Sequence, residues 1–446
     1  MENKVIQGIL HLCTPTFRQL LRPIKAGDNC TINGVHGSAQ SLLTSFIYRE
    51  LATPLIFISP SDEEAEDFFN DITFFIQDTS YVDLYLYKST PYIDIINLGL
   101  GSVEATLNIL YKLSKGNGKN LIVTTLKTLS KRLVPFNVVK QNVQKIELGD
   151  QIERDFLIEM LNDWGFRREY TVGNRGEMSI RGDIVDIFPP YRKSPVRLEV
   201  PFDVIESIRE FDPLTQRSST YMNELLLLPA QEIVIREQEL EIAFSRIKER
   251  ADALNIPRSK RDNIIDRIKN QADCLKDSLL PFFYDETSTI FDYVPDRTIF
   301  MYERPYELED EFHRFWRKVE TDYERVLHHK NIVARPEELF MSLPSLKEKL
   351  DSFSCVTFND IESKGPSWNV VNLDITENSE FQKKEHQPFQ NIIETIKDLQ
   401  SSNFVILMSA TSKEQSERID FLLGSNEIST SLNQETLNRD KVNIII

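Results

Sequence analysis

The chain has 446 residues, of which 52 are basic and 69 are acidic, so its formal net charge is −17. Such a chain is not expected to wrap nucleic acid over its whole surface, because phosphate binding needs a concentrated positive surface; a local basic patch stays compatible with it. At about 150 residues per domain, the length predicts about three domains. The four cysteines are too few for a disulfide scaffold and fit no metal-binding spacing.

Targeting signals and membrane spans are not expected. The N-terminal apolar stretch is interrupted by Gln7 and His11 and has no basic region before it, unlike a secretory signal. No run approaches the length of about 18 apolar residues that spans a membrane. These features and the low cysteine content predict a reducing, cytoplasmic location without membrane contact.

Strands and helices alternate along the first 140 residues. Residues 5–25 are expected to form a pair of helices. The expected strands cover residues 30–33, 54–59, 83–87 and 119–125, and the expected helices cover residues 38–51, a segment capped by Ser61, 102–114 and 126–133. This alternation predicts a parallel, doubly wound sheet.

The pattern changes near residue 145. A helix over residues 150–164 is expected to end at Gly165, and short alternating strands follow it. These strands are expected at residues 177–180, 184–187, 196–200 and 205–210. The region is predicted to be a small, mainly antiparallel domain inserted into the first α/β unit.

Helical and α/β patterns return after the insert. Residues 236–280 are predicted to be helical, and a strand at 298–302 leads into a long helix over 306–329. A last α/β unit is expected over 345–446. Its expected strands lie near 354–358, 368–372 and 403–409, and its expected helices lie near 387–400 and 412–424.

The chain ends in the β-branched run Val442–Ile446, which predicts a buried strand. Because natural termini are usually polar and frayed, such a strand at the last residue suggests that the chain is cut from something longer. A C-terminal strand tied into a sheet is the alternative interpretation.

The segment from Gly34 to Ser41 lies between a strand and a helix, where a phosphate-binding loop belongs. Gly34 and Ser41 fit the first glycine and the hydroxyl of the pattern GxxxxGK[ST], and Gly37 lies between them. However, Ala39 and Gln40 replace the second glycine and the lysine. Glutamine carries no charge for the phosphates, and alanine adds a Cβ where the backbone must approach them. Nucleotide binding is therefore expected to be weak or absent; an ordinary crossover turn is the alternative.

Other catalytic or metal sites are not predicted. A phosphate loop also needs an acid after an apolar strand to hold Mg²⁺. At the end of the candidate strand this position falls near Tyr302 and Glu303, so the requirement is only partly met. The helicase-like tripeptide Ser409–Thr411 is too short to distinguish from coincidence. None of the six histidines has cysteine or histidine partners at metal-ligand spacing.

The predicted inserted domain has an unusual charge balance. Residues 165–220 hold nine basic and nine acidic side chains, and eight of the nine basic residues are arginines. Arginine is favoured at interfaces that need planar contacts with carboxylates. Arg181 and Arg197 each adjoin a strand and are candidates to project from one face toward a partner. Salt bridges within the domain are the alternative interpretation.

Three segments carry a family resemblance. Residues 176–189 (GEMSIRGDIVDIFP), 196–199 and 205–217 resemble the region shared by the excision-repair protein UvrB and the transcription-repair coupling factors of the Mfd family. The altered phosphate loop, the segment Leu225–Ala230 and the segment Asp292–Pro295 favour the coupling factors. The resemblance covers nearly the whole chain.

The resemblance implies an α/β fold in four parts. A UvrB-like, degenerate helicase-type domain with a parallel sheet would comprise residues 1–140 and 226–345. It would be split by a UvrA-binding α+β domain over 141–225 and followed by a small α/β domain over 346–446. The family recruits UvrA to RNA polymerase stalled at DNA lesions. Its two contact arginines fall on Arg181 and Arg197, and its contact aromatic falls on Pro201, beside Phe202.

The resemblance also implies what this segment would not do. The family's polymerase-binding module and ATP-dependent DNA translocase motor follow the part that this chain resembles. Polymerase, DNA, ATP and Mg²⁺ would be bound there, leaving this segment without a cofactor or ATPase activity. The family hides the UvrA-binding face against the motor at rest, so this chain, expected to be monomeric, would expose that face.

Two alternatives stand beside this interpretation. One is a UvrB-type, nucleotide-binding helicase-like DNA-repair domain, which Gln40 disfavours. The other is a DNA-damage clamp, which would need an aromatic-rich hairpin. The corresponding segment, residues 87–101, is short, and Tyr92 is its main aromatic residue.

Overall fold

A computed structural model describes most of the chain. The described residues are 17–18, 20–35, 37–51, 53–76, 78–88, 92, 101–115, 119–234, 236–269, 277–359, 368–373, 375, 388–410, 412–432 and 437–445. The chain divides into two compact units, Met1–Leu51 with Asp67–Thr79 and Val356–Ile446, and Ala52–Glu66 with Ser80–Cys355. Most of the predicted helix pair over 5–25, His36, Thr411 and most of 87–101 lie outside the described residues.

The first unit contains parallel strands in the order β15-β1-β14, and the second unit contains parallel strands in the order β13-β2-β4-β3. In the first unit, β1 (Cys30–Asn33) pairs in parallel with β14 (Ser354–Asn359) and β15 (Asn369–Asn372), and α2 (Ser38–Glu50) follows β1. The predicted boundary of a last α/β unit at residue 346 does not coincide with the sheet, because β14 and β15 lie beside β1. Cys30 is in register with Val356, a pairing between distant segments that local sequence patterns do not encode.

The second unit contains four parallel strands of its own. They are β2 (Leu55–Ser59), β3 (Val82–Leu84), β4 (Leu121–Thr125) and β13 (Ile299–Glu303). Every residue of β2 and β4 is buried, as expected for parallel strands covered on both faces. The sheet's connections contain η1 (Thr79–Tyr81), α3 (Asp62–Phe75), α4 (Gly101–Ser114), α5 (Leu126–Ser130) and α6 (Phe136–Gln141). Ser61 caps α3 as predicted, accepting a hydrogen bond from the Glu64 amide at 3.2 Å.

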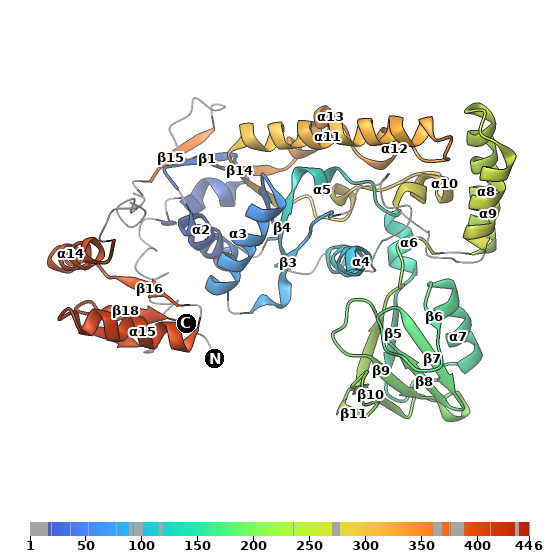
Figure 1. Ribbon diagram of the computed structural model, residues 1–446, viewed down its shortest axis with the longest axis horizontal. Coiled ribbons are helices and arrows are strands. Elements are labelled where there is room, and N and C mark those ends of the chain that lie inside the picture. The colour runs from blue at the N-terminus through green and yellow to red at the C-terminus, as the bar shows by residue number, and fades with distance from the viewer. Residues whose placement is uncertain are drawn as a thin grey trace. The chain divides into compact units, whose positions relative to one another are not determined.

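The inserted domain is the green lobe in Figure 1. Its elements are β5 (Gln144–Glu147), α7 (Arg154–Asp163), β6 (Arg167–Arg168), β7 (Glu177–Arg181), β8 (Ile184–Ile187), β9 (Val196–Glu199), η2 (Pro201–Asp203), β10 (Ser207–Phe211), β11 (Ser218–Tyr221) and β12 (Glu224–Leu227). A six-stranded sheet has the order β11-β10-β9-β8-β7-β6, and β5 pairs with β12 where the chain enters and leaves.

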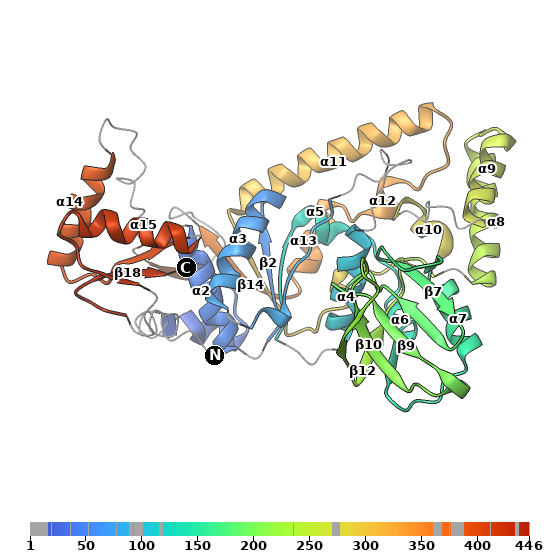
Figure 2. The ribbon, with the colours of Figure 1, turned by 60° about the horizontal axis from the view of Figure 1, so that its bottom comes forward.

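The core of the inserted domain lies between the sheet and α7, which Figure 2 shows packed together. Val185 and Leu198 of the sheet belong to one buried cluster with Leu157 and Trp164. Val234 belongs to the same cluster, so the domain's core extends beyond the predicted boundary at residue 225. Gly165 follows α7 with a positive φ of 79°, which confirms it as the helix-ending residue.

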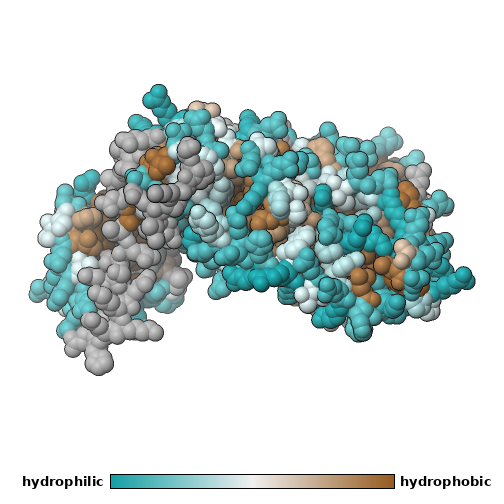
Figure 3. All heavy atoms as spheres, turned by 90° about the horizontal axis from the view of Figure 1, so that it is seen from above, coloured by the Kyte–Doolittle hydropathy of each residue, from teal (hydrophilic) through white to brown (hydrophobic). Residues whose placement is uncertain are grey.

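Helices fill the rest of the second unit. They are α8 (Glu237–Ala253), α9 (Arg258–Lys269), η3 (Asp277–Leu279), α10 (Leu280–Phe283), η4 (Ile290–Asp292), α11 (Pro305–His328), α12 (Pro336–Leu339) and α13 (Leu343–Leu350). Figure 3 shows the side of the molecule on which α11 lies; that surface is mainly hydrophilic, with separate apolar patches. Among the described residues, no helix is both long enough and apolar enough to cross a membrane.

The C-terminal part has its own parallel sheet. Its elements are α14 (Pro388–Ser401), β16 (Leu407–Ser409), α15 (Lys413–Gly424), β17 (Thr430–Leu432) and β18 (Val442–Ile445). The strand order is β16-β18-β17, so β18 is central and buried along its whole length. This confirms the predicted strand at Val442–Ile446 over its described residues.

Candidate partner-binding face of the inserted domain

One face of the inserted domain's sheet carries polar side chains. Strand alternation turns Val185 and Leu198 into the core, and the residues beside them therefore lie on the opposite face. A single row crosses that face from β7 to β11 in direct register: Ser179, Asp186, Arg197, Arg209 and Tyr221. We call this surface the outer face.

Asp186 holds both predicted arginines together. Its carboxylate is fully buried and accepts hydrogen bonds from Arg197 Nε at 2.7 Å and Arg197 Nη2 at 2.9 Å. Arg181, diagonally across from it on β7, donates from Nη2 to Asp186 Oδ2 at 2.5 Å. Arg181 and Arg197 therefore lie together on one face, and both are bound to Asp186 of the same domain.

The two arginines differ in their access to solvent. The Arg197 side chain is only 14% exposed, and its guanidinium lies over the Phe211 ring at 4.7 Å. Hydrogen bonding to Asp186 raises the pKa of Arg197 above its ordinary value, so its charge is secure. The Arg181 side chain is 39% exposed. Arg181 can therefore reach a partner directly, whereas Arg197 mainly orients the cluster.

The rest of the outer face also pairs its charges. Arg209 forms an ion pair with Glu199 and lies 5.6 Å from the centre of the Tyr221 ring. On the other side of the sheet, Arg192 contacts Glu210 at 2.6 Å. Salt bridges within the domain, the alternative raised by the balanced composition, thus account for much of its arginine content. Such pairing fixes the side chains and leaves a surface of alternating charge.

Pro201 and Phe202 lie in the turn between β9 and β10. Phe202 is 95% exposed, and its φ of 52° is unfavourable for a bulky residue. Pro201 is half-buried beside it. An exposed aromatic ring in a strained backbone conformation is uncommon away from functional surfaces.

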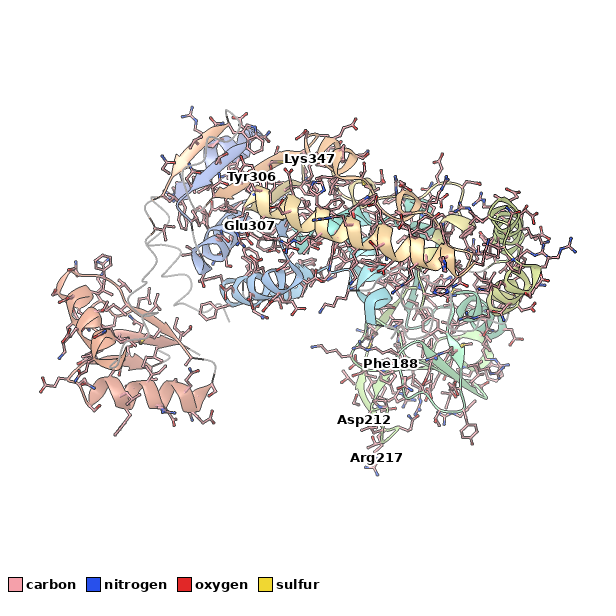
Figure 4. All side chains as sticks on the ribbon, turned by 45° about the horizontal axis from the view of Figure 1, so that its top comes forward. Phe188, Asp212, Arg217, Tyr306, Glu307 and Lys347 are labelled. Atoms are coloured by element: carbon pink, nitrogen blue, oxygen red, sulfur yellow. The ribbon has the colours of Figure 1, made fainter. Side chains whose placement is uncertain are left out.

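Apolar side chains concentrate on the surface of this domain. Twelve large hydrophobic residues are exposed among the described residues, and six of them lie within residues 145–233: Leu148, Phe156, Tyr170, Phe202, Leu214 and Tyr221. Figure 4 shows the lower tip of the domain, where Asp212 and Arg217 close the loop that carries Leu214, with Phe188 further inside. The domain therefore exposes large apolar side chains more often than the rest of the described chain, and each is a candidate anchor for a partner.

Groups of the same chain contact the residues of the predicted phosphate loop closely. Gln40 is buried and donates from Nε2 to the Val35 carbonyl at 3.2 Å, and Ser41 is buried beside it. Gly34 has a φ of 75°, and the Leu373 carbonyl lies so close that a Cβ added at Gly34 would meet its oxygen at 2.1 Å. Gly37 precedes α2 with a φ of 51°, and Ala39 is half-buried.

The predicted acid at the end of β13, Glu303, lies beside the guanidinium of Arg304. Glu303 is buried, and the Nη2 atom of Arg304 lies 3.6 Å from its carboxylate. Arg304 also pairs with Glu64 and with Glu307, which Figure 4 shows beside Tyr306 at the start of α11. In the described part of the chain, no group of three or more His, Cys, Asp or Glu residues is arranged to hold a metal ion.

Asp186 is one of nine acids in this part of the sequence and was not predicted as a site residue. Strand alternation carries the missing signal, because an acid between Val185 and Ile187 must point away from the core. The cross-strand partner, Arg197, follows from strand register, which the sequence does not specify.

Comparisons with known proteins show what the inserted domain and the whole chain are similar to. Residues 145–233 match the family model of the UvrB interaction domain. The chain is 26% identical over 356 residues to a transcription-repair-coupling factor of Myxococcus xanthus, covering 76% of this chain and 29% of that protein. It is 25% identical over 438 residues to the one from Bacillus subtilis, covering 93% and 36%. The resemblance inferred from the sequence is thus confirmed, and the chain spans about a third of the length of these relatives.

Proposed function

We propose that this chain, which is similar over most of its length to transcription-repair-coupling factors, acts as the part of such a factor that binds UvrA. The inserted domain would make this contact and so bring UvrA to RNA polymerase stalled at a DNA lesion. The observation that carries the proposal is the outer face, where a buried Asp186 holds the exposed Arg181 in place.

The chemistry of this face suits a partner that presents carboxylates. A guanidinium offers five donors, and the contact of Arg181 with Asp186 leaves others for a partner. Because Asp186 already fixes the side chain, less rotamer entropy would be lost on binding. Phe202 would add apolar contact area beside this charged centre.

Nucleotide chemistry is not part of this proposal. Gln40 supplies no charge and is bonded to the Val35 carbonyl, and the Leu373 carbonyl packs closely against Gly34 at the start of the loop. We infer that this segment neither binds nor hydrolyses ATP. In a full-length coupling factor, ATP, Mg²⁺, DNA and polymerase would be handled by parts beyond the region that this chain matches.

Titration calorimetry of the full chain with purified UvrA tests the proposal. The chain is expected to bind without any activator. Arg181→Glu is expected to weaken binding by about 30-fold or more, as for an interface hot spot. Lys193→Glu is a matched control, because it reverses an exposed charge in the connection between β8 and β9. Equal affinity of the two variants would sink the assignment.

A further inference from the structure

Three segments of the inserted domain are fastened together at one end of the sheet. The Arg154 side chain donates from Nη1 to the Gly182 carbonyl at 2.8 Å, and its amide donates to Asp203 Oδ1 at 3.0 Å. The Val200 amide reaches the Asp183 carbonyl at 2.7 Å. The β7–β8 turn, the turn with Phe202 and the start of α7 therefore form one continuous rim, which we call the α7 rim.

A groove opens on the α7 side of this rim. It has a volume of about 410 Å³ and is lined by Gln144, Gln151, Ile152, Glu153, Phe156, Leu157 and Met160. Phe156 is 58% exposed, and Met160 follows it by one helical turn, so the two side chains border the groove together. The Ile152 amide donates to the Asp203 carbonyl at 2.8 Å, which links the groove to the turn that carries Phe202.

We propose that the UvrA-binding surface does not end at the outer face but continues around the α7 rim into the Phe156 groove. This inference rests on the proposed function. Arg181, Phe202 and Phe156 would be successive anchors of one surface. Phe202 joins the two halves, because its turn is bonded both to the β7–β8 turn and to the start of α7.

The groove defines the chemistry of the UvrA segment that would fill it. Its floor is apolar, and the flexible Met160 can adapt to the shape of an inserted side chain. Glu153 lines the groove, and Glu159 is exposed on α7 one residue before Met160. The fitting segment would insert one aromatic or aliphatic side chain flanked by lysine or arginine. This charge preference is opposite to that of the arginines on the outer face, so the two halves would set the orientation of UvrA.

The strain in the Phe202 turn supports this role. Phe202 and Asp203 both have positive φ values, 52° and 62°, which cost energy for residues with a Cβ. The bonds from Arg154 and Ile152 to Asp203 hold this conformation in place. The turn thus presents an exposed aromatic ring from a fixed backbone, which lowers the entropy lost on binding.

Titration of UvrA into full-chain variants tests the inference. Phe156→Ala is expected to weaken binding by about tenfold, the loss typical of a truncated interface anchor. Phe404→Ala is the matched control, because Phe404 is 57% exposed and lies outside the inserted domain. Glu153→Lys and Glu159→Lys should each also weaken binding, and more strongly at low salt, if cations of UvrA flank the groove.

The outcomes separate this inference from the proposed function. Weakening by both Arg181→Glu and Phe156→Ala, with Phe404→Ala unchanged, supports the extended surface. Weakening by Arg181→Glu alone overturns the extension and leaves the proposed function standing. Failure of the unmodified chain to bind UvrA overturns both. Thermal melting of each variant checks that the substitution leaves the fold intact, and the melting temperatures are expected to match that of the unmodified chain.

Discussion

Arg197 and Asp186 form a two-pronged ion pair on the outer face of the inserted domain, with Nε–Oδ1 and Nη2–Oδ2 distances of 2.7 and 2.9 Å. The pair joins directly opposed residues of β8 and β9. It serves as the fixed base on which the more exposed Arg181 rests. The stability of the domain and the orientation of its candidate contact residue therefore depend on the same carboxylate.

Asp186→Asn should destabilise the inserted domain by about 3 kcal/mol, because removing one member of a buried ion pair leaves its partners without compensation. Trp164, which is buried in this domain's core, reports local unfolding. We would follow its fluorescence during urea unfolding in a chain whose other two tryptophans are replaced by phenylalanine. Asp183→Asn, at an exposed acid of the adjacent turn, should change stability by less than about 1 kcal/mol. Equal effects of both substitutions would contradict the role of Asp186.

Substitutions of Arg181 and Arg197 should differ in their effects on UvrA affinity and on the free energy of unfolding. Arg181→Ala is expected to weaken UvrA binding while the free energy of unfolding changes by less than about 1 kcal/mol, because the side chain is partly exposed. Arg197→Ala should lower both, since it removes the stacking on Phe211 and leaves Asp186 with one partner. Urea unfolding and UvrA titration of the same preparations check this split. A large stability loss from Arg181→Ala, with unchanged affinity, would reverse the assigned roles.

Glu177 should make the inserted domain sensitive to acid. Its burial favours a raised pKa, but hydrogen bonds from the Gly173 amide and from the Asn174 amide and side chain outweigh this and lower the pKa below its ordinary value. A lowered folded-state pKa stabilises the fold above the unfolded-state pKa of about 4.5, and this contribution is lost as the pH falls through the folded-state pKa.

The stability difference between the wild type and Glu177→Gln should therefore be largest near neutral pH and shrink below about pH 4. Urea unfolding at a series of pH values, read through Trp164, measures it. Glu169→Gln, at an exposed acid in the same domain, should show no comparable trend. A difference for Glu177→Gln that stays constant with pH would argue that its carboxylate is not responsible.

Restoring the missing lysine should not restore nucleotide binding. Gln40→Lys supplies the charge, but the Leu373 carbonyl still lies against Gly34, and Ala39 still replaces a glycine. Calorimetry with ATP and Mg²⁺ should detect no binding to either the wild type or the variant. Micromolar binding gained by Gln40→Lys would show that the missing charge alone, and not the closed loop, prevents nucleotide binding.

The sequence predicted local elements better than their assembly. Strands such as Ile184–Ile187 were located correctly because their apolar alternation is local. The pairing of β14 and β15 with β1 was missed, because β1 lies more than 300 residues away in sequence. Asp186 was overlooked as the centre of the site for a similar reason. Its importance comes from cross-strand contacts with Arg197 and a diagonal contact with Arg181, neither of which follows from spacing along the chain.

The central claim is that UvrA binds the inserted domain at its outer face. Hydrogen–deuterium exchange of the full chain, with and without UvrA, tests this most directly. We expect UvrA to slow exchange at the amides of Arg181–Ile184 and of Phe202–Val204, while the amides of β18 are unchanged. Binding that leaves these two turns unprotected, or that protects only residues outside 145–233, would contradict the account.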